Sequence, residues 1–323
     1  MKYIIGILAI SLGLLFSCDK VNNAYPVGLP STGLNWNLYP SGDSTDYVNN
    51  GNWLPFTTNT NTNRNIVVED FTGHTCTYCP FAAVIAEDIK AANPGRAFIA
   101  TIHTSELGLG SFQEAAATGW FTTDFTCEVG LSIGKHFGME WPGSSFSGNP
   151  RGTVSRSLNG GTQPTAHHSQ WTAIADNLIA TNDLKVNIQA NSNYFPSTRG
   201  YFLHVELDQL DAALTNEMTI VVQLIEDTIV KPQKFQGGTF PVPSPFDAID
   251  TAYVHRDILR GCVDGRAFGQ TLDVEHKDAN GKYYFNYSYE LPMELESTNT
   301  HVLIYVRDVV TEEIYHAIEQ HIE

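Results

Sequence analysis

The sequence predicts an α/β domain followed by an all-β antiparallel sandwich, and two observations carry this prediction. Between residues 64 and 183, segments with strand and helix patterns alternate, which is typical of βαβ units. After Asn182 the pattern changes to successive period-two segments separated by turn residues, which indicates antiparallel strands. The 323 residues are enough for two domains, and a hydrophobic content of 42% allows each of them a core.

The amino terminus predicts an export signal over residues 1–17. Lys2 precedes an apolar run at residues 3–17, which is shorter than the roughly 20 residues of a membrane span and fits a signal peptide. The run ends in "LLFSC" and resembles the lipobox of a bacterial lipoprotein, although Phe16 is bulkier than usual at its position. The resemblance implies cleavage before Cys18 and a lipid on that residue. The alternative is an ordinary cleaved signal with a chance cysteine.

Residues 18–63 are predicted to form a lipidated tether. They are rich in Asn, Ser, Thr, Gly and Pro, which favours loops over regular structure. Aromatic residues in this segment are expected to pack locally: Trp36, Tyr39, Trp53 and Phe56.

The charge of the chain limits its partners. A net charge of −17, from 18 Lys and Arg against 35 Asp and Glu, leaves no basic face for nucleic acid. It also argues against adhesion to anionic lipid through a basic patch. Membrane attachment is therefore expected through the lipid on Cys18.

The α/β domain is predicted over residues 64–183. Pro80 fits the first turn of a helix, where its missing N–H is not needed. The strand at 97–104 is apolar on both faces, which is typical of a central parallel strand. The predicted elements in order are a strand at 65–71, a helix from 80 to 92, a strand at 97–104, a helical region at 112–137, a strand at 152–156 and a helix at 165–181.

The second domain is predicted over residues 184–323, with the boundary near 182–184. Its strands should form an antiparallel sandwich of the immunoglobulin-like kind. Asp278–Gly281 precedes one of them and is a hairpin signal. The predicted strands are 184–192, 201–210, 217–230, 282–291 and 301–309.

Cys76 and Cys79 lie where the first strand meets the first helix. A Cys-x-x-Cys motif at that junction is typical of a thioredoxin-like redox site. Amides at a helix N-terminus lower the pKa of a nearby thiol, so Cys76 is the candidate nucleophile and Cys79 the resolving thiol.

The stretch "DFTGHTCTYC" also resembles the thioredoxin pattern Asp-Phe-x-x-x-x-Cys-x-x-Cys. This resemblance implies that Asp70 accepts the proton of the resolving thiol. It further implies that Pro150 follows a cis peptide bond beside Cys76 and shapes the substrate edge. Thioredoxins often carry Gly-Pro between the cysteines, whereas this chain carries Thr77 and Tyr78.

Two other interpretations of Cys76 and Cys79 stay open. The pair could be a structural disulfide, or it could join His74 and His103 in binding copper or zinc. No second Cys-x-x-Cys is present to close a zinc site, and no cofactor is predicted.

The remaining exported cysteines, Cys127 and Cys262, are expected to form one inter-domain disulfide, because neither has another partner once Cys76 pairs with Cys79. The alternative is two buried free thiols that pack as small hydrophobic groups.

Several segments together resemble the twenty-eight-kilodalton outer-membrane protein family of Gram-negative bacteria. They are the lipobox, "FTGHTCTYCP", "NPRGTVSR" and "HRDILRG". The resemblance implies an outer-membrane lipoprotein with a thioredoxin-like domain followed by a β-sandwich.

Two functions follow from these observations. The first is thiol–disulfide exchange through Cys76 and Cys79, by an oxidoreductase or isomerase. The second is a non-enzymatic surface lipoprotein that binds or assembles other outer-membrane or exported proteins, with Cys76–Cys79 as a structural disulfide.

Overall fold

The computed structural model describes residues 33–104, 112–143, 148–236 and 248–322. Within them, one mixed sheet of nine strands has the order β16-β15-β7-β12-β2-β1-β3-β4, with β13 also paired to β7. Its strands are β1 (Ile66–Thr72), β2 (Ala97–His103), β3 (Arg151–Val154), β4 (Thr165–Ala166), β7 (Met218–Glu226), β12 (Ile258–Cys262), β13 (Gln270–Thr271), β15 (Thr300–Asp308) and β16 (Ile314–His321). The chain is therefore a mixed α/β protein, as the sequence predicts at this coarser level.

The α/β half of the molecule runs from β1 to α4. Strands β1 and β2 are parallel, and β3 lies antiparallel on the other side of β1. Helices α2 (Cys79–Ala92) and α4 (Trp171–Thr181) bury an apolar core against one face of this sheet, while α3 (Glu128–Lys135) packs on the opposite face. Residues of strand β1 are buried along its whole length because helices cover both of its faces.

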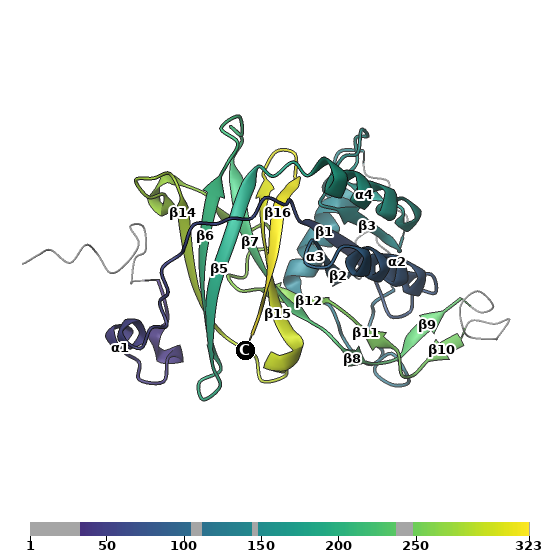
Figure 1. The fold of residues 1–323 in the computed structure, drawn as a ribbon. Coiled ribbons are helices and arrows are strands. Elements are labelled where there is room, and N and C mark those ends of the chain that lie inside the picture. Colours follow the sequence, from purple (N-terminus) through teal and green to yellow (C-terminus); the bar gives the residue numbers. More distant parts are fainter. Residues whose placement is uncertain (1–32, 105–111, 144–147, 237–247, 323) are drawn as a thin grey trace, which may run out of the picture.

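The β half runs from β5 to β16. Strands β5 (Val186–Phe195), β6 (Gly200–Gln209) and β14 (Tyr283–Glu290) form an antiparallel sheet. This sheet shares an apolar core with β7, β15 and β16. Figure 1 shows the two sheets of this half on one side of the molecule and the helices of the α/β half on the other.

Strand β12 joins the two halves. Ile258 pairs with Thr101 of β2 in parallel, while the rest of β12 pairs with β7 antiparallel. The backbone N–H of Thr101 also donates to the carbonyl of Asp257 at 2.7 Å. One sheet thus runs through both halves, and one apolar core lies against α3 and strands from both.

A buried charged network also crosses this junction. Arg156, which follows β3, donates to both carboxylate oxygens of Glu69 on β1, at 2.9 and 2.6 Å. The same guanidinium donates to the hydroxyl of Tyr305 on β15 at 3.1 Å and to Glu312 at 3.3 Å. Arg156 and Glu69 are both fully buried, so their charges depend on each other.

The described part of the predicted tether, residues 33–63, packs on the β half. It contains η1 (Trp36–Leu38) and α1 (Ser44–Asn49) and then crosses β5 and β6 on its way to β1 (Figure 1). Tyr47 is fully buried, stacks near Phe202 and shares a hydrogen bond of 2.9 Å with His204. The aromatic residues expected to pack locally do so against this sheet rather than only against one another.

The strand predicted at 217–230 is divided into β7 and β8 (Ile229–Val230), which lie in different sheets. Two predicted helices also differ from the structure. The helical region expected at 112–137 is helical only from Glu128, since the described residues before it form turns and extended chain. The helix expected from residue 165 begins at Trp171, because β4 and η3 (His168–Gln170) precede it. Polar and aromatic residues in those stretches give a helix-like pattern without a continuous apolar face.

A long excursion, here called the arm, separates β7 from β12. Its described parts contain β8 (Ile229–Val230), β9 (Gln233–Phe235), β10 (Ala248–Asp250) and β11 (Val254–His255). Figure 1 shows the arm leaving the β half and lying beside the α/β half near α2.

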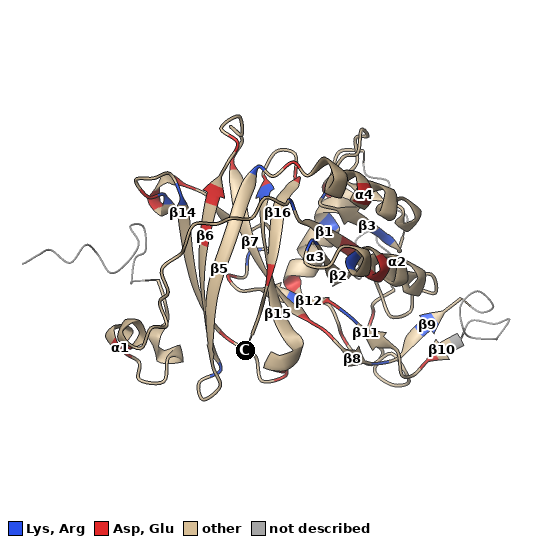
Figure 2. Ribbon diagram, in the orientation of Figure 1, with Lys and Arg blue, Asp and Glu red and all other residues tan. Residues whose placement is uncertain are grey.

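Figure 2 marks both basic and acidic residues on α2 and on the chain beside it. The closest pair there is Lys90 of α2 with Asp257, at 2.9 Å. This ion pair adds a second polar link between the halves.

Candidate functional site

The Cys76–Cys79 disulfide lies between β1 and α2. Cys79 is the first residue of α2, and Pro80 is the second, where its missing N–H costs no hydrogen bond. The N-cap residue, Tyr78, makes no side-chain capping bond and is 53% exposed. The loop therefore presents Tyr78 to solvent while the two sulfurs face inward.

Both cysteines are almost completely buried, with 2% of each exposed. One cover over the loop is the segment at Phe112 and Gln113. The backbone N–H of Thr75 donates to the carbonyl of Phe112 at 2.9 Å, and that of His74 donates to the Gln113 side chain at 3.2 Å.

Strand β9 of the arm is the second cover. Backbone N–H groups of Lys234 and Gln236 donate to the carbonyls of His74 and Thr77, each at 2.8 Å. The Gln233 side-chain amide donates to the carbonyl of Cys76 at 3.1 Å. The cysteine loop is thus hydrogen-bonded to a strand that comes more than 150 residues later in the chain.

Gly73 allows the first cover to lie so close. A Cβ added at this position would be 2.6 Å from both the carbonyl carbon and the oxygen of Phe112, which real Cβ atoms do not tolerate. We expect Gly73→Ala to displace the 112–113 segment and weaken one or two hydrogen bonds of about 1 kcal/mol each. The disulfide should then be reduced by dithiothreitol roughly 5 to 30 times faster.

The matched control is Gly33→Ala, because a Cβ at Gly33 meets nothing within 4 Å. Samples are quenched with acid and alkylated, and the reduced fraction of Cys76 and Cys79 is read by mass spectrometry in both variants and the native chain. Equal rates in all three would show that the Phe112 segment does not limit access.

Asp70 of β1 lies in the wall of a cavity that Cys79 also lines. It is 1% exposed, and its Oδ1 atom has no hydrogen-bond partner. Burial raises the pKa of this carboxyl to about 8, so the group is mostly protonated at neutral pH. Asp70 and Cys79 line the same cavity of about 230 Å³, which extends between α2 and the arm.

Histidines from two strands, β2 and β11 (Val254–His255), border this region. The rings of His103 and His255 both lie against Phe125, with centroids 4.7 and 4.6 Å from it, and their own centroids are 5.8 Å apart. Burial lowers the pKa of His103 well below its usual value and that of His255 to about 4, so both are neutral at pH 7. Tyr253 and Gln233 complete the wall nearest the arm.

Cys76 and Cys79 are not free thiolates in this structure, so they do not form the metal site considered as an alternative. Cys76 and Cys79 are bonded to each other, and the ring of His74 lies 3.1 Å from the carbonyl of Glu114. A disulfide sulfur is not a thiolate, so in this state the residues offer a metal two imidazoles at most.

Pro150 follows a cis peptide bond from Asn149, as the sequence predicts. Pro150, Asn149 and Tyr78 line a surface groove of about 380 Å³, together with His167 and His168. Both polar atoms of the Asn149 side chain are buried without a hydrogen-bond partner.

Cys127 and Cys262 do not form the predicted disulfide, because both are free thiols. Cys127 is the N-cap of α3, where its Sγ accepts from the N–H of Gly130 at 3.3 Å and donates to the carbonyl of Leu259 at 3.5 Å. Cys262 is buried in β12, and burial raises the pKa of both thiols. Cys127 is hydrogen-bonded as a helix cap and Cys262 packs within β12, so neither needs a disulfide. This agrees with the alternative in which the two free thiols pack as small hydrophobic groups.

Local sequence patterns do not reveal the residues that enclose the disulfide. Phe112 fell inside a region assigned to a helix, and Gln233 fell outside every predicted strand. His255 lies in the "HRDILRG" segment, which indicates the family resemblance but does not predict a role at the site. A short run of alternating residues after "TIV" was the available signal for β9.

Cys18 lies outside the described residues, so the predicted lipid anchor has no structural account. Among the residues that the structure does describe, none of the helices is both long enough and apolar enough to cross a membrane.

Together the fold and the site define a mixed α/β protein whose Cys-x-x-Cys disulfide is enclosed by a later part of its own chain. The family model described as outer membrane protein Omp28 matches residues 143–320, more than half of the chain. The chain therefore belongs to the Omp28 family of outer-membrane proteins, which confirms the predicted resemblance and the predicted outer-membrane location.

Solved structures add a fold comparison. HBP35 of Porphyromonas gingivalis is 15% identical with a TM-score of 0.56, and the match covers 82% of this chain and 77% of that one. A domain of the outer membrane lipoprotein Omp28 from Porphyromonas gingivalis is 20% identical over 43% of this chain and 88% of that chain, with a TM-score of 0.29. A protein of Agrobacterium tumefaciens is 13% identical over 80% and 94%, with a TM-score of 0.44. At this sequence identity, the match to HBP35 supports a shared fold and nothing more. The TM-scores of the other two matches are too low to support a conclusion. No curated protein matches the chain.

Proposed function

We propose that this outer-membrane protein is anchored by a lipid on Cys18 and performs thiol–disulfide exchange through Cys76 and Cys79. Its substrates are disulfides of other exported or outer-membrane proteins. The α/β half is assigned a thioredoxin-like fold and the β half an immunoglobulin-like sandwich, with the boundary near residues 182–184.

Topology supports the thioredoxin-like assignment. The strand that leads into the cysteines, β1, lies between parallel β2 and antiparallel β3, and β4 follows β3 at the edge. Pro150 comes immediately before β3, so the strand pairing brings it to the same end of the sheet as the cysteine loop. The groove beside Tyr78 and Pro150 offers an extended peptide a place next to the disulfide.

The observation that carries the proposal is Asp70. A buried carboxyl without a partner at Oδ1 is unfavourable for folding, and such groups cluster at functional sites. A pKa of about 8 is close to neutral pH, so this group can both accept and release a proton there. It lines the same cavity as Cys79, the thiol that has to lose a proton.

The exchange proceeds in two steps from the reduced protein. The Cys76 thiolate attacks a substrate disulfide, which forms a mixed disulfide and releases one substrate thiolate. In the fraction of molecules in which Asp70 is ionised, Cys79 then passes its proton to the Asp70 carboxylate, and the new thiolate attacks Cys76. This closes Cys76–Cys79, releases the second substrate thiolate and leaves Asp70 protonated.

Because both sulfurs are buried, the site has to open before exchange can occur. Substrate reaches Cys76 only after β9 or the Phe112 segment moves, because both are hydrogen-bonded across the loop. The site is therefore closed in its oxidised state, and exchange is coupled to opening of this cover.

The same burial favours a second function, a binding or assembly subunit in which the disulfide is structural. A disulfide with 2% of each cysteine exposed is protected from thiols in solution. In this reading the protein binds partners through its surface, and the Cys76–Cys79 bond holds the loop for β9.

A redox titration separates the two functions. The mature chain is equilibrated with reduced and oxidised glutathione, quenched with acid and alkylated, and the state of Cys76 and Cys79 is read by mass spectrometry. We expect an exchange protein to titrate within the range of glutathione buffers. A structural disulfide stays oxidised to potentials below about −300 mV.

Trapping in cells gives the matched experiment. Cys79→Ser should accumulate mixed disulfides through Cys76, whereas Cys262→Ser, which removes a buried free thiol, should accumulate none. Absence of adducts in Cys79→Ser, together with a disulfide that resists glutathione, would establish the structural role.

A further inference from the structure

Three side chains that can bind metal ions lie together on the β15–β16 pair. His301 and His321 are directly opposite each other in the antiparallel register. Glu319 lies two residues before His321, so its side chain is on the same face of the sheet. Leu303 and Ala317 of that face belong to the core shared by the two halves, and the group lies where this core ends.

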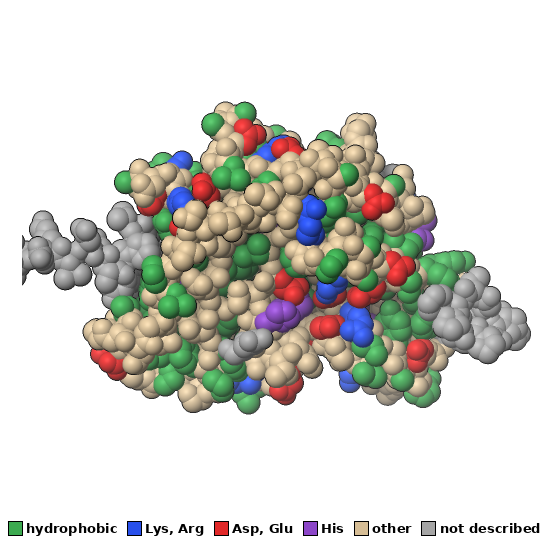
Figure 3. Space-filling view, in the orientation of Figure 1, with side chains coloured by type: hydrophobic (Ala, Val, Ile, Leu, Met, Phe, Trp, Pro, Cys, Tyr) green, Lys and Arg blue, Asp and Glu red, His purple; other side chains and the backbone are tan. Residues whose placement is uncertain are grey.

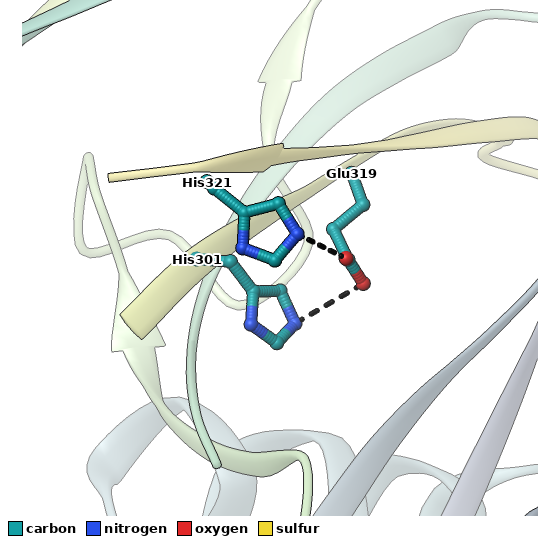
Figure 4. A group of neighbouring side chains, drawn as sticks. All are labelled: His301, Glu319 and His321. Atoms are coloured by element: carbon teal, nitrogen blue, oxygen red, sulfur yellow. Dashed lines mark ion pairs between the residues drawn. The ribbon is translucent and has the colours of Figure 1, made fainter. Parts of the chain in front are cut away.

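The carboxylate of Glu319 lies between the two imidazoles, as Figure 4 shows. Nε2 of His301 is 3.3 Å from one of its oxygens, and Nε2 of His321 is 3.2 Å from the other. Donor atoms around a tetrahedral zinc ion, with bonds of 2.0–2.1 Å, are roughly 3.3–3.5 Å apart. One donor atom from each residue can be chosen so that all three lie within 4.8 Å of one another.

His301 supplies a second, independent observation. Its side chain is only 6% exposed, and its Nε2 atom is buried without a hydrogen bond although Glu319 is close. A buried ring nitrogen without a partner is unfavourable unless something binds it. It points into the group from the protein side, while His321 is 63% exposed and closes the group from the solvent side.

The surrounding charges allow a cation at this position. Lys90 approaches from α2, but both oxygens of Asp257 bind its ammonium group, at 2.9 and 3.0 Å. Asp257 is itself 3.9 Å from Nε2 of His301. Figure 3 shows histidine and acidic side chains together on the molecular surface where the two halves meet.

We propose that His301, Glu319 and His321 bind one divalent transition-metal ion of the zinc type. Two imidazoles and one carboxylate are a donor set that zinc accepts with a fourth position left open. The exposure of His321 leaves that position to water or to a donor from another molecule. This site is separate from the cysteines, and it does not depend on the exchange activity proposed above.

Calorimetric titration of the untagged mature chain with zinc sulfate tests the site. We expect one zinc per chain, and an affinity at least about tenfold lower in His321→Gln and in Glu319→Gln. Both substitutions are on partly exposed side chains, so the fold is kept, which the far-ultraviolet circular dichroism checks.

His276→Gln is the matched control, because His276 pairs with Asp273 at 2.7 Å in a histidine–carboxylate pair that has no second histidine beside it among the described residues. Its zinc affinity should equal that of the native chain. X-ray absorption at the zinc edge should show nitrogen and oxygen donors. A sulfur shell, unchanged affinity in His321→Gln and Glu319→Gln, or no bound zinc would each overturn the proposal.

Discussion

Replacing Asp70 with asparagine should make the folded protein more stable than the native chain at pH 8. Burial raises the pKa of Asp70 from 3.8 to about 8, so between these values the folded chain holds a proton that the unfolded chain has lost. The stability that this proton contributes is complete below about pH 4 and is lost as the pH rises toward 8. Asparagine does not titrate, so the gain of the variant over the native chain should grow from near zero at about pH 4 to roughly 2–5 kcal/mol at about pH 8.

Urea unfolding at several pH values measures this gain. The control is Asp88→Asn, which removes an exposed carboxyl at the rim of the same cavity and should follow the native curve. Parallel curves for Asp70→Asn and the native chain would mean that Asp70 is not protonated in the fold. In the proposed exchange cycle, the same variant should also lose the proton acceptor of Cys79, so that it becomes slower while it becomes more stable.

Replacing Arg156 with methionine should destabilise the protein by about 3–5 kcal/mol, because Glu69 is left as a fully buried carboxylate without its cation. Methionine fills similar space and stays apolar, so the effect comes from the lost charge pair more than from a cavity. The shared sheet and apolar core still join the two halves, so the unfolding transition should remain single while its midpoint falls.

Chemical denaturation of two further chains completes this test. Arg256→Met removes an exposed ion pair with Asp227, whose atoms are 3.4 Å apart, and should cost less than about 1 kcal/mol. Glu69→Gln in the Arg156→Met background should recover part of the loss, because the unpaired charge is gone. If Arg156→Met and Arg256→Met are equally mild, the buried network does not hold the halves together.

The centre of the candidate site was predictable from local sequence. A strand, Gly73, two cysteines and Pro80 together specify a strand-to-helix turn, and Asn149-Pro150 before a short strand identified the second side of the groove. These features depend on residues close in sequence, where period and turn chemistry are informative.

What encloses the site was not predictable in the same way. Strand β9 is three residues long, pairs with the equally short β10, and is hydrogen-bonded to the cysteine loop across more than 150 residues of chain. Strand β12 contains Gly261 at a register shift, so "DILRG" shows no clean alternation although it links the sheet of both halves. Such pairings are decided by tertiary packing.

The proposed metal-binding group of His301, Glu319 and His321 shows a third reason why sequence alone was not sufficient. Residues Glu319 and His321 have the spacing of one strand face, but β16 itself was not predicted, and His301 is adjacent only through the register of β15 with β16. The prediction of a Cys127–Cys262 disulfide was wrong for a different reason. An even number of exported cysteines suggested pairing by elimination, whereas Cys127 is occupied as a helix cap.

The cover over the disulfide also sets an order of events during biogenesis. A chain made and exported from its amino terminus brings out Cys76 long before Gln233, which lies 157 residues later. At usual synthesis rates this separation corresponds to roughly 8–30 s. During that interval the two sulfurs are open to the oxidants of the envelope, and the pair can close before β9 arrives. The later strand then seals the redox state that the emerging chain has already acquired.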